Sequence, residues 1–117
     1  MPLPVAADDV MAAVADARDA MVPASEAERR AAMWRLMRFC GVPEGWREDG
    51  EAYITDYCAL IGDLPPDLLG VAVWRWLRRS PFFPAPAELL AEVADEMAAR
   101  RFAWTKLESA VREVEAQ

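Results

Sequence analysis

Apolar residues recur at every third or fourth position along five stretches of the chain, which is the pattern of amphipathic helices. Valine and isoleucine are few and never alternate with polar residues over the length of a strand, so no strand is expected. The pattern predicts an all-α fold, a compact bundle of about five helices in a single domain over residues 1–117. The expected helices are Asp8–Met21, Ser25–Cys40, Glu51–Ile61, the Leu64-Pro65-Pro66 step to Arg79, and Ala87–Val114.

Several of these helices carry start and stop signals. Ser25-x-x-Glu28 matches a capping box, and Gly41 stands where a left-handed residue would end the second helix. The segment Ser80–Pro86 holds three prolines, which interrupt any helix there. The last helix would be roughly 40 Å long at 1.5 Å per residue. Since one small core cannot cover that length, its far half from Trp104 is expected to project beyond the core or to pack on another chain.

The fourth helix carries the most information about binding. A projection at about 100° per residue places Pro66, Leu69, Gly70, Val73 and Leu77 on one face, the expected core face, flanked by Trp74 and Trp76. The opposite face carries Leu68, Val71, Ala72, Arg75, Arg78 and Arg79. Apolar residues beside arginines suit a partner-binding surface, because arginine and tryptophan are favoured interface anchors. Alternatively, the arginines pair with nearby acids or complement the helix dipole, and the surface is solvated.

Two further segments hold candidate contact residues. Phe82 and Phe83 lie in the proline-rich segment, where we expect them to close the end of the helical core, although an exposed phenylalanine there would be an anchor for a partner. An apolar seam with a spacing of three and four follows in the last helix and is interrupted by Arg100. It suits helix-in-groove binding or self-association, or else it packs on the chain's own core. The seam contains Trp104, Leu107, Val111 and Val114.

Composition limits the class of protein. A hydrophobic content of 55% in 117 residues argues for a folded domain. The sequence contains no apolar run of about 20 residues and no secretory signal, so we expect a cytoplasmic protein without membrane contact. The net charge of −7 argues against direct nucleic-acid binding, which depends on cations facing phosphates. Cys40 and Cys58 fall on apolar helix faces and are expected to be reduced core thiols.

The residues available for catalysis are few. The chain has no histidine, which removes the commonest general base and metal ligand. The five glycines match no phosphate-binding pattern, and the two isolated cysteines do not make a zinc site of the usual kind. Paired acids have the positions of helix caps and solvated faces. We therefore expect no enzyme, no cofactor and no metal, with a carboxylate-only metal site as the alternative that spacing leaves open.

The middle of the chain resembles a known family. Tyr53-Ile-Thr-Asp-Tyr57 is followed by Leu60-Ile-Gly-Asp63-Leu-Pro65, then by Ala72-Val-x-Arg75 and Phe82-Phe-Pro84-Ala-Pro-Ala-Glu88-Leu89. This order is similar to a small helical domain of phage and prophage replication proteins, including the helicase-loader inhibitors. The resemblance covers about 45 residues, mostly turn prolines, a capping acid and core aromatics. In the loader inhibitors the C-terminal tail is largely unfolded alone and contributes to helicase binding, whereas the tail here is predicted to be helical.

The resemblance implies a phage-type adaptor or inhibitor that binds a replicative helicase or its loader through protein–protein contact. The candidate partner-binding residues are Leu68, Val71, Arg75, Arg78, Arg79, Trp104, Leu107 and Val111. One alternative is a phage-encoded, anti-CRISPR-like inhibitor of a host defence system or nucleic-acid enzyme, because an acidic surface can occupy a nucleic-acid channel. Another is a structural helical homodimer formed through the C-terminal helix.

Overall fold

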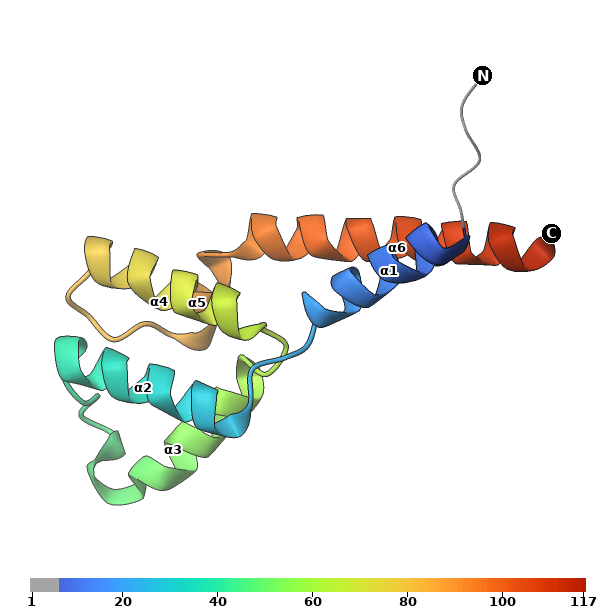
Figure 1. Cartoon of the computed structure of the whole chain (residues 1–117). Helices are drawn as coiled ribbons and strands as arrows, with labels where there is room; N and C mark the ends of the chain where they lie inside the picture. The colour runs from blue at the N-terminus through green and yellow to red at the C-terminus, as the bar shows by residue number, and fades with distance from the viewer. Residues whose placement is uncertain (1–6) are drawn as a thin grey trace. The chain divides into compact units, whose positions relative to one another are not determined.

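The computed structural model describes residues 7–117, and every regular element in that range is an α-helix (Figure 1). The predicted all-α fold with a long C-terminal helix is therefore confirmed. The chain forms two compact units: a central unit, Val22–Ala94, and a terminal unit that combines the residues up to Met21 with Asp95–Gln117. The prediction that the chain has no secretory signal is based in part on residues 1–6, which lie outside the described range.

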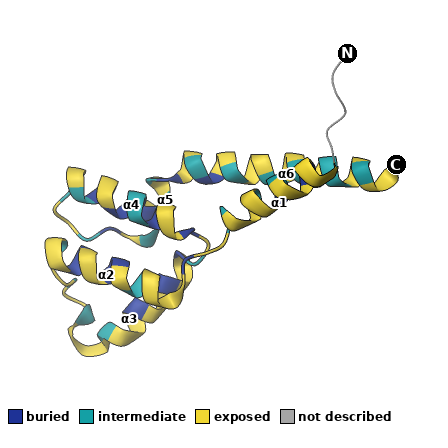
Figure 2. Cartoon of the chain, in the orientation of Figure 1, coloured by how far each residue is buried: buried dark blue, intermediate teal, exposed yellow. Residues whose placement is uncertain are grey.

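The central unit contains four helices: α2 (Glu26–Cys40), α3 (Trp46–Leu60), α4 (Pro66–Arg79) and α5 (Pro86–Ala91). Helices α2 and α4 lie side by side and run in the same direction, so that both end at the same end of the unit (Figure 1). Helix α3 packs on α2, and α5 packs on α4. The buried faces of these helices meet in one core (Figure 2). Its most buried large side chains are Met33, Leu36, Ile61, Leu64, Val73, Leu89 and Val93.

The second helix begins and ends as its sequence predicts. The Ser25 hydroxyl accepts a hydrogen bond from the Glu28 backbone N–H (3.1 Å), and the Ser25 N–H donates to the Glu28 carboxylate (2.9 Å). These two bonds complete the predicted capping box. At the other end Gly41 has a φ of 78°, and its N–H donates to the Met37 carbonyl. Only glycine adopts that backbone conformation without steric cost, so the chain leaves the helix there.

The third helix begins earlier than predicted. Glu51 was expected to start it, but the structure has a helical turn from Trp46 and a break in helical conformation at Asp49 (φ −128°, ψ 39°). The glycines in this stretch favour a loop. Packing overrides that preference because the Trp46 ring lies against Tyr53 and Phe83.

The predicted helix Ala87–Val114 is two helices, α5 and α6 (Ala94–Ala116). The N–H groups of Glu92 and Val93 donate to carbonyls three residues back, those of Leu89 and Leu90, which is the tighter pattern of a turn. The Glu92 carbonyl accepts a hydrogen bond from the Arg75 guanidinium (2.7 Å). A contact distant in sequence thus stabilises a break that helical periodicity does not reveal.

The terminal unit pairs α1 (Ala7–Asp19) with α6, and the two helices run antiparallel (Figure 1). Val10 and Val14 are the buried residues of α1. Arg100, which interrupts the apolar seam of α6, donates to the Ala20 carbonyl at 2.7 Å. A cation at that place satisfies a carbonyl left over at the C-terminal end of α1 and suits the helix dipole.

Two other findings concern the cysteines and the membrane. Both thiols are free; Cys58 is buried and Cys40 half-buried, as expected for core thiols. Burial raises the pKa of each above its ordinary value, which keeps the sulfur protonated and less reactive. In residues 7–117, every helix is too short or too polar to cross a bilayer.

Truncating Leu36 tests the core. Leu36 has no exposed surface, so Leu36→Ala is expected to lower the free energy of unfolding in urea by about 2–5 kcal/mol through lost burial and the remaining cavity. Leu60→Ala is the matched control, because Leu60 is 64% exposed and its loss should change stability by less than about 0.5 kcal/mol. Equal effects of the two substitutions would contradict the assignment of this core.

Candidate partner-binding site

The face of helix α4 that packs into the core differs from the predicted one. Leu68 and Ala72 were expected to point outward, but they are buried, with 4% and 0% of their surfaces exposed. Leu77 was expected in the core and is only half-buried. The helix packs on both α2 and α5, and its buried residues are Leu68, Leu69, Ala72, Val73 and Trp76. Leu68 is therefore a core residue and not part of a partner-binding surface, and Val71 is half-buried.

Two of the three predicted arginines of α4 bind Glu92. Arg75 donates to the Glu92 carbonyl, and Arg79 forms an ion pair with the Glu92 carboxylate. The Arg79 guanidinium also lies 5.0 Å from the centroid of the Trp76 ring. Arg75 and Arg79 thus tie α4 to the turn after α5, and the Arg79–Glu92 pair is a pairing with a nearby acid, as one of the two interpretations supposed. Arg78 points elsewhere and lies 5.8 Å from the centroid of the exposed Trp74 ring.

The proline-rich segment separates its two phenylalanines. The Trp76 indole N–H donates to the Phe82 carbonyl at 2.6 Å, and the Tyr57 hydroxyl donates to the Pro84 carbonyl at 2.8 Å. With the backbone held in this way, Phe83 packs edge-on against Trp46 and Tyr57. The expectation that both phenylalanines close the core is therefore right for Phe83 and wrong for Phe82, which is 74% exposed.

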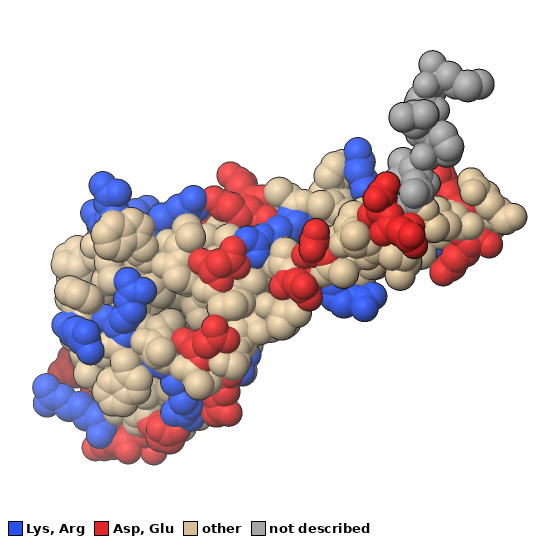
Figure 3. All heavy atoms as spheres, in the orientation of Figure 1, with Lys and Arg blue, Asp and Glu red and all other residues tan. Residues whose placement is uncertain are grey.

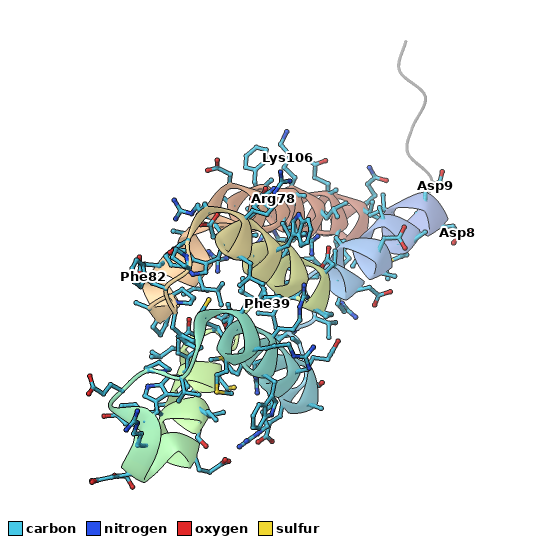
Figure 4. All side chains as sticks on the ribbon, turned by 90° about the vertical axis from the view of Figure 1, so that its left-hand side faces the viewer. Asp8, Asp9, Phe39, Arg78, Phe82 and Lys106 are labelled. Atoms are coloured by element: carbon cyan, nitrogen blue, oxygen red, sulfur yellow. The ribbon has the colours of Figure 1, made fainter. Side chains whose placement is uncertain are left out.

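An exposed apolar and cationic surface forms where α2 and α4 end. We call it the arginine–aromatic surface and define it by Phe39, Trp74, Arg78 and Phe82. Phe39 and Arg78 line one shallow hollow of about 390 Å³ together with Leu77 and Pro81. Phe39, Trp74 and Phe82 are 66%, 56% and 74% exposed. Figure 4 shows Phe39, Arg78 and Phe82 on three different segments at this end of the unit.

The charge at this end of the central unit is opposite to that of the whole chain. The chain carries a net charge of −7, yet Arg38 and Arg78 lie exposed in the last turns of α2 and α4. Figure 3 shows Lys and Arg side chains gathered over this end, with uncharged surface between them. Exposed aromatic side chains beside arginines are the composition of interface anchors. The complementary partner surface would be apolar with an acidic rim.

The predicted seam of the C-terminal helix lies against α1 within the terminal unit. Trp104, Leu107, Val111 and Val114 are half-buried. Trp104 and Val111 line a hollow with Val14, and the Arg18 guanidinium lies 5.9 Å from the centroid of the Trp104 ring. Leu107 and Val114 line a second hollow with Val10. The seam thus has an intrachain neighbour, and a role for Trp104, Leu107 and Val111 in partner binding stays a prediction.

Sequence reasoning missed Phe39 as a contact residue. The stripe of α2 runs through Met33, Leu36, Met37 and Cys40, and Phe39 falls outside it beside Arg38. An aromatic residue off the apolar stripe of an amphipathic helix is the signal that identifies it. Trp74 was placed at the flank of the core face and is more exposed than that position suggested.

Comparison with known protein families, with curated proteins and with solved structures found no match. In the part of the chain from residue 7 onward, no three acidic or cysteine side chains are grouped closely enough to hold a metal ion. The candidate site is defined by exposed residues of the central unit.

Removing the Tyr57 hydroxyl tests the bond that positions the proline-rich segment. Tyr57 is 5% exposed, and Tyr57→Phe leaves the Pro84 carbonyl without this donor. We expect a loss of about 1 kcal/mol in the free energy of unfolding at pH 7, measured in urea. Tyr53→Phe, at a residue that is 47% exposed, is the control and should change stability by less.

The Tyr57→Phe variant also tests a predicted dependence of stability on pH. Burial, and after it the charge of Glu88, raises the pKa of Tyr57 above 10. The buried, neutral Tyr57 contributes fully to the free energy of unfolding below pH 10. This contribution is lost as pH rises, because the Tyr57 hydroxyl ionises at lower pH in the unfolded chain than in the folded protein. Between pH 10 and 12 the wild-type protein should lose stability more steeply than Tyr57→Phe, by up to about 1.4 kcal/mol per pH unit. Parallel curves for the two proteins would contradict a buried, neutral Tyr57.

Proposed function

We propose that this protein is a phage-type adaptor or inhibitor that binds a replication protein, a replicative helicase or its loader, by protein–protein contact. Two things support the proposal. The first is the resemblance over residues 53–97 to the small helical domain of phage replication proteins. The second is the arginine–aromatic surface, which lies in the central unit, the unit that contains most of the resembling residues.

The observation that carries the proposal is the exposure of three large aromatic side chains, of which Phe39 and Trp74 lie beside Arg78. Phe39, Trp74 and Phe82 come from α2, α4 and the segment after α4, and each is more than half exposed. Leaving such side chains in water forgoes about 25 cal/mol for each Å² of apolar surface that burial would remove. Exposed aromatic side chains beside an arginine are typical of a protein interface.

The charge pattern favours a protein partner with an acidic rim. Arg78 and Arg38 are exposed cations on an acidic protein, and long-range repulsion between the remaining carboxylates and phosphate groups disfavours a nucleic-acid backbone. Arginine contacts with carboxylates at the rim would speed association more than they strengthen the complex. Binding should therefore weaken moderately as salt is raised, while the aromatic contribution persists.

The proposal predicts binding to the purified host helicase or its loader that depends on two aromatic residues. Phe39→Ala and Trp74→Ala should each raise the dissociation constant at least about tenfold, because anchors of this kind contribute about 1.4 kcal/mol or more. Both side chains are exposed, so their removal should leave the fold intact. The measurement is biolayer interferometry with the full-length protein.

Trp34→Ala is the matched control. Trp34 is 63% exposed on α2 and lies outside the arginine–aromatic surface, so its loss should change affinity less than about twofold. If the wild-type protein binds neither the helicase nor the loader, the proposed function is wrong. If it binds and all three variants bind equally well, the assignment of the surface is wrong.

A further inference from the structure

The central unit has a second hollow, distinct from the arginine–aromatic surface. It has a volume of about 400 Å³, within the range of about 300–1,000 Å³ found for ligand pockets. Its aromatic walls come from two segments: Trp46, Tyr53 and Tyr57 belong to α3, and Phe83 comes from the proline-rich segment. We call it the aromatic hollow.

Two rings of the aromatic hollow are parallel, and the Phe83 ring stands at a steep angle to its neighbours. Trp46 and Tyr53 are stacked, with centroids 5.8 Å apart and an interplanar angle of 5°. Phe83 meets Trp46 at 66° and Tyr57 at 82°, with centroids 5.0 and 5.8 Å apart. The Tyr57 hydroxyl donates a hydrogen bond to the Pro84 carbonyl, so the orientation of the tyrosine ring is fixed before a ligand binds. A hollow walled by rings that pack against one another is preorganised, which lowers the entropic cost of binding.

The charges around the aromatic hollow have one sign. The lining side chains with a formal charge are Asp56 and Glu88, and both are carboxylates. One Glu88 oxygen accepts a hydrogen bond from the Ala85 N–H at 2.9 Å, which holds the carboxylate at the beginning of α5. Asp56 is exposed on α3, one residue before Tyr57. These acids repel anions, and aromatic ring faces attract cations.

From these observations we infer that the aromatic hollow is a binding site for an arginine side chain of a partner protein. The guanidinium is planar and stacks on aromatic faces, and it donates paired hydrogen bonds to carboxylates such as Asp56. The aliphatic stem of arginine suits the apolar lining, since such stems bury along apolar surface while the charged head stays near water. The inference depends on the aromatic hollow alone and does not require the partner proposed above.

The test uses short peptides and the intact protein. Acetyl-Gly-Arg-Gly-amide is titrated against labelled protein, and the indole N–H signal of Trp46 is followed by NMR. We expect a saturable shift with a dissociation constant on the order of 1 mM. The citrulline peptide, which has the same shape without the charge, should bind at least about tenfold more weakly. The leucine and lysine peptides should also bind more weakly than the arginine peptide.

Substitutions then locate the site. Asp56→Asn, at an exposed position, should weaken binding of the arginine peptide about two- to fivefold. Asp63→Asn is the control, because Asp63 is an exposed carboxylate of the same unit that does not line the hollow, and it should leave binding unchanged.

Several results would overturn the inference. Equal binding of the arginine and citrulline peptides, or tighter binding of the leucine peptide, would make the hollow an apolar site. A lysine peptide that binds as tightly as the arginine peptide would refute selection of the guanidinium. No shift at Trp46 at tens of millimolar peptide would mean that no such site exists.

Discussion

The backbone between α4 and α5 is held at two carbonyl groups by two aromatic side chains, and the surfaces of the central unit depend on these bonds. Trp76 on α4 donates to the Phe82 carbonyl, and Tyr57 on α3 donates to the Pro84 carbonyl. A segment with three prolines has few N–H groups of its own for regular structure, so its carbonyls must find donors elsewhere. The two donors are themselves buried, at 5% exposure each, and therefore rigid.

Fixing these carbonyls determines where the two phenylalanines point. Phe83 becomes a wall of the aromatic hollow, and Phe82 becomes part of the arginine–aromatic surface. Arg75 and Arg79 add a second connection by binding Glu92 at the turn after α5. The same contacts that close the core of the central unit thus produce two exposed sites of different chemistry. One site offers cations and aromatic rings, and the other offers carboxylates and aromatic rings.

The sequence predicted the elements better than the surfaces. The capping box at Ser25 and the glycine at position 41 are local signals, and both act as predicted because the atoms involved are close in sequence. The break at Glu92 and the helical turn at Trp46 depend on contacts with Arg75 and with Phe83, which no local pattern contains. Tertiary packing overrides local preference at such places.

The candidate site shows the same limit. A helical projection assigns faces correctly only when the direction of the core is known, and α4 packs on both α2 and α5. Leu68 was therefore placed outside and is inside, whereas Arg78 was placed outside and is exposed. Phe39 was missed because the apolar stripe of α2 is complete without it, so its position outside the stripe does not disturb the helical pattern. The aromatic hollow was missed because Phe83, one of its walls, is distant in sequence from the three rings of α3.

The most direct measurement of the central claim is fluorine NMR of protein labelled with 4-fluorophenylalanine, in the presence of a soluble paramagnetic agent. The chain has four phenylalanines, of which Phe39, Phe82 and Phe102 are 66%, 74% and 64% exposed. The account predicts that these three signals broaden strongly and that the Phe83 signal broadens least. Strong broadening of Phe83, or protection of Phe82, would contradict it, because the segment between α4 and α5 would then not be held in the described conformation.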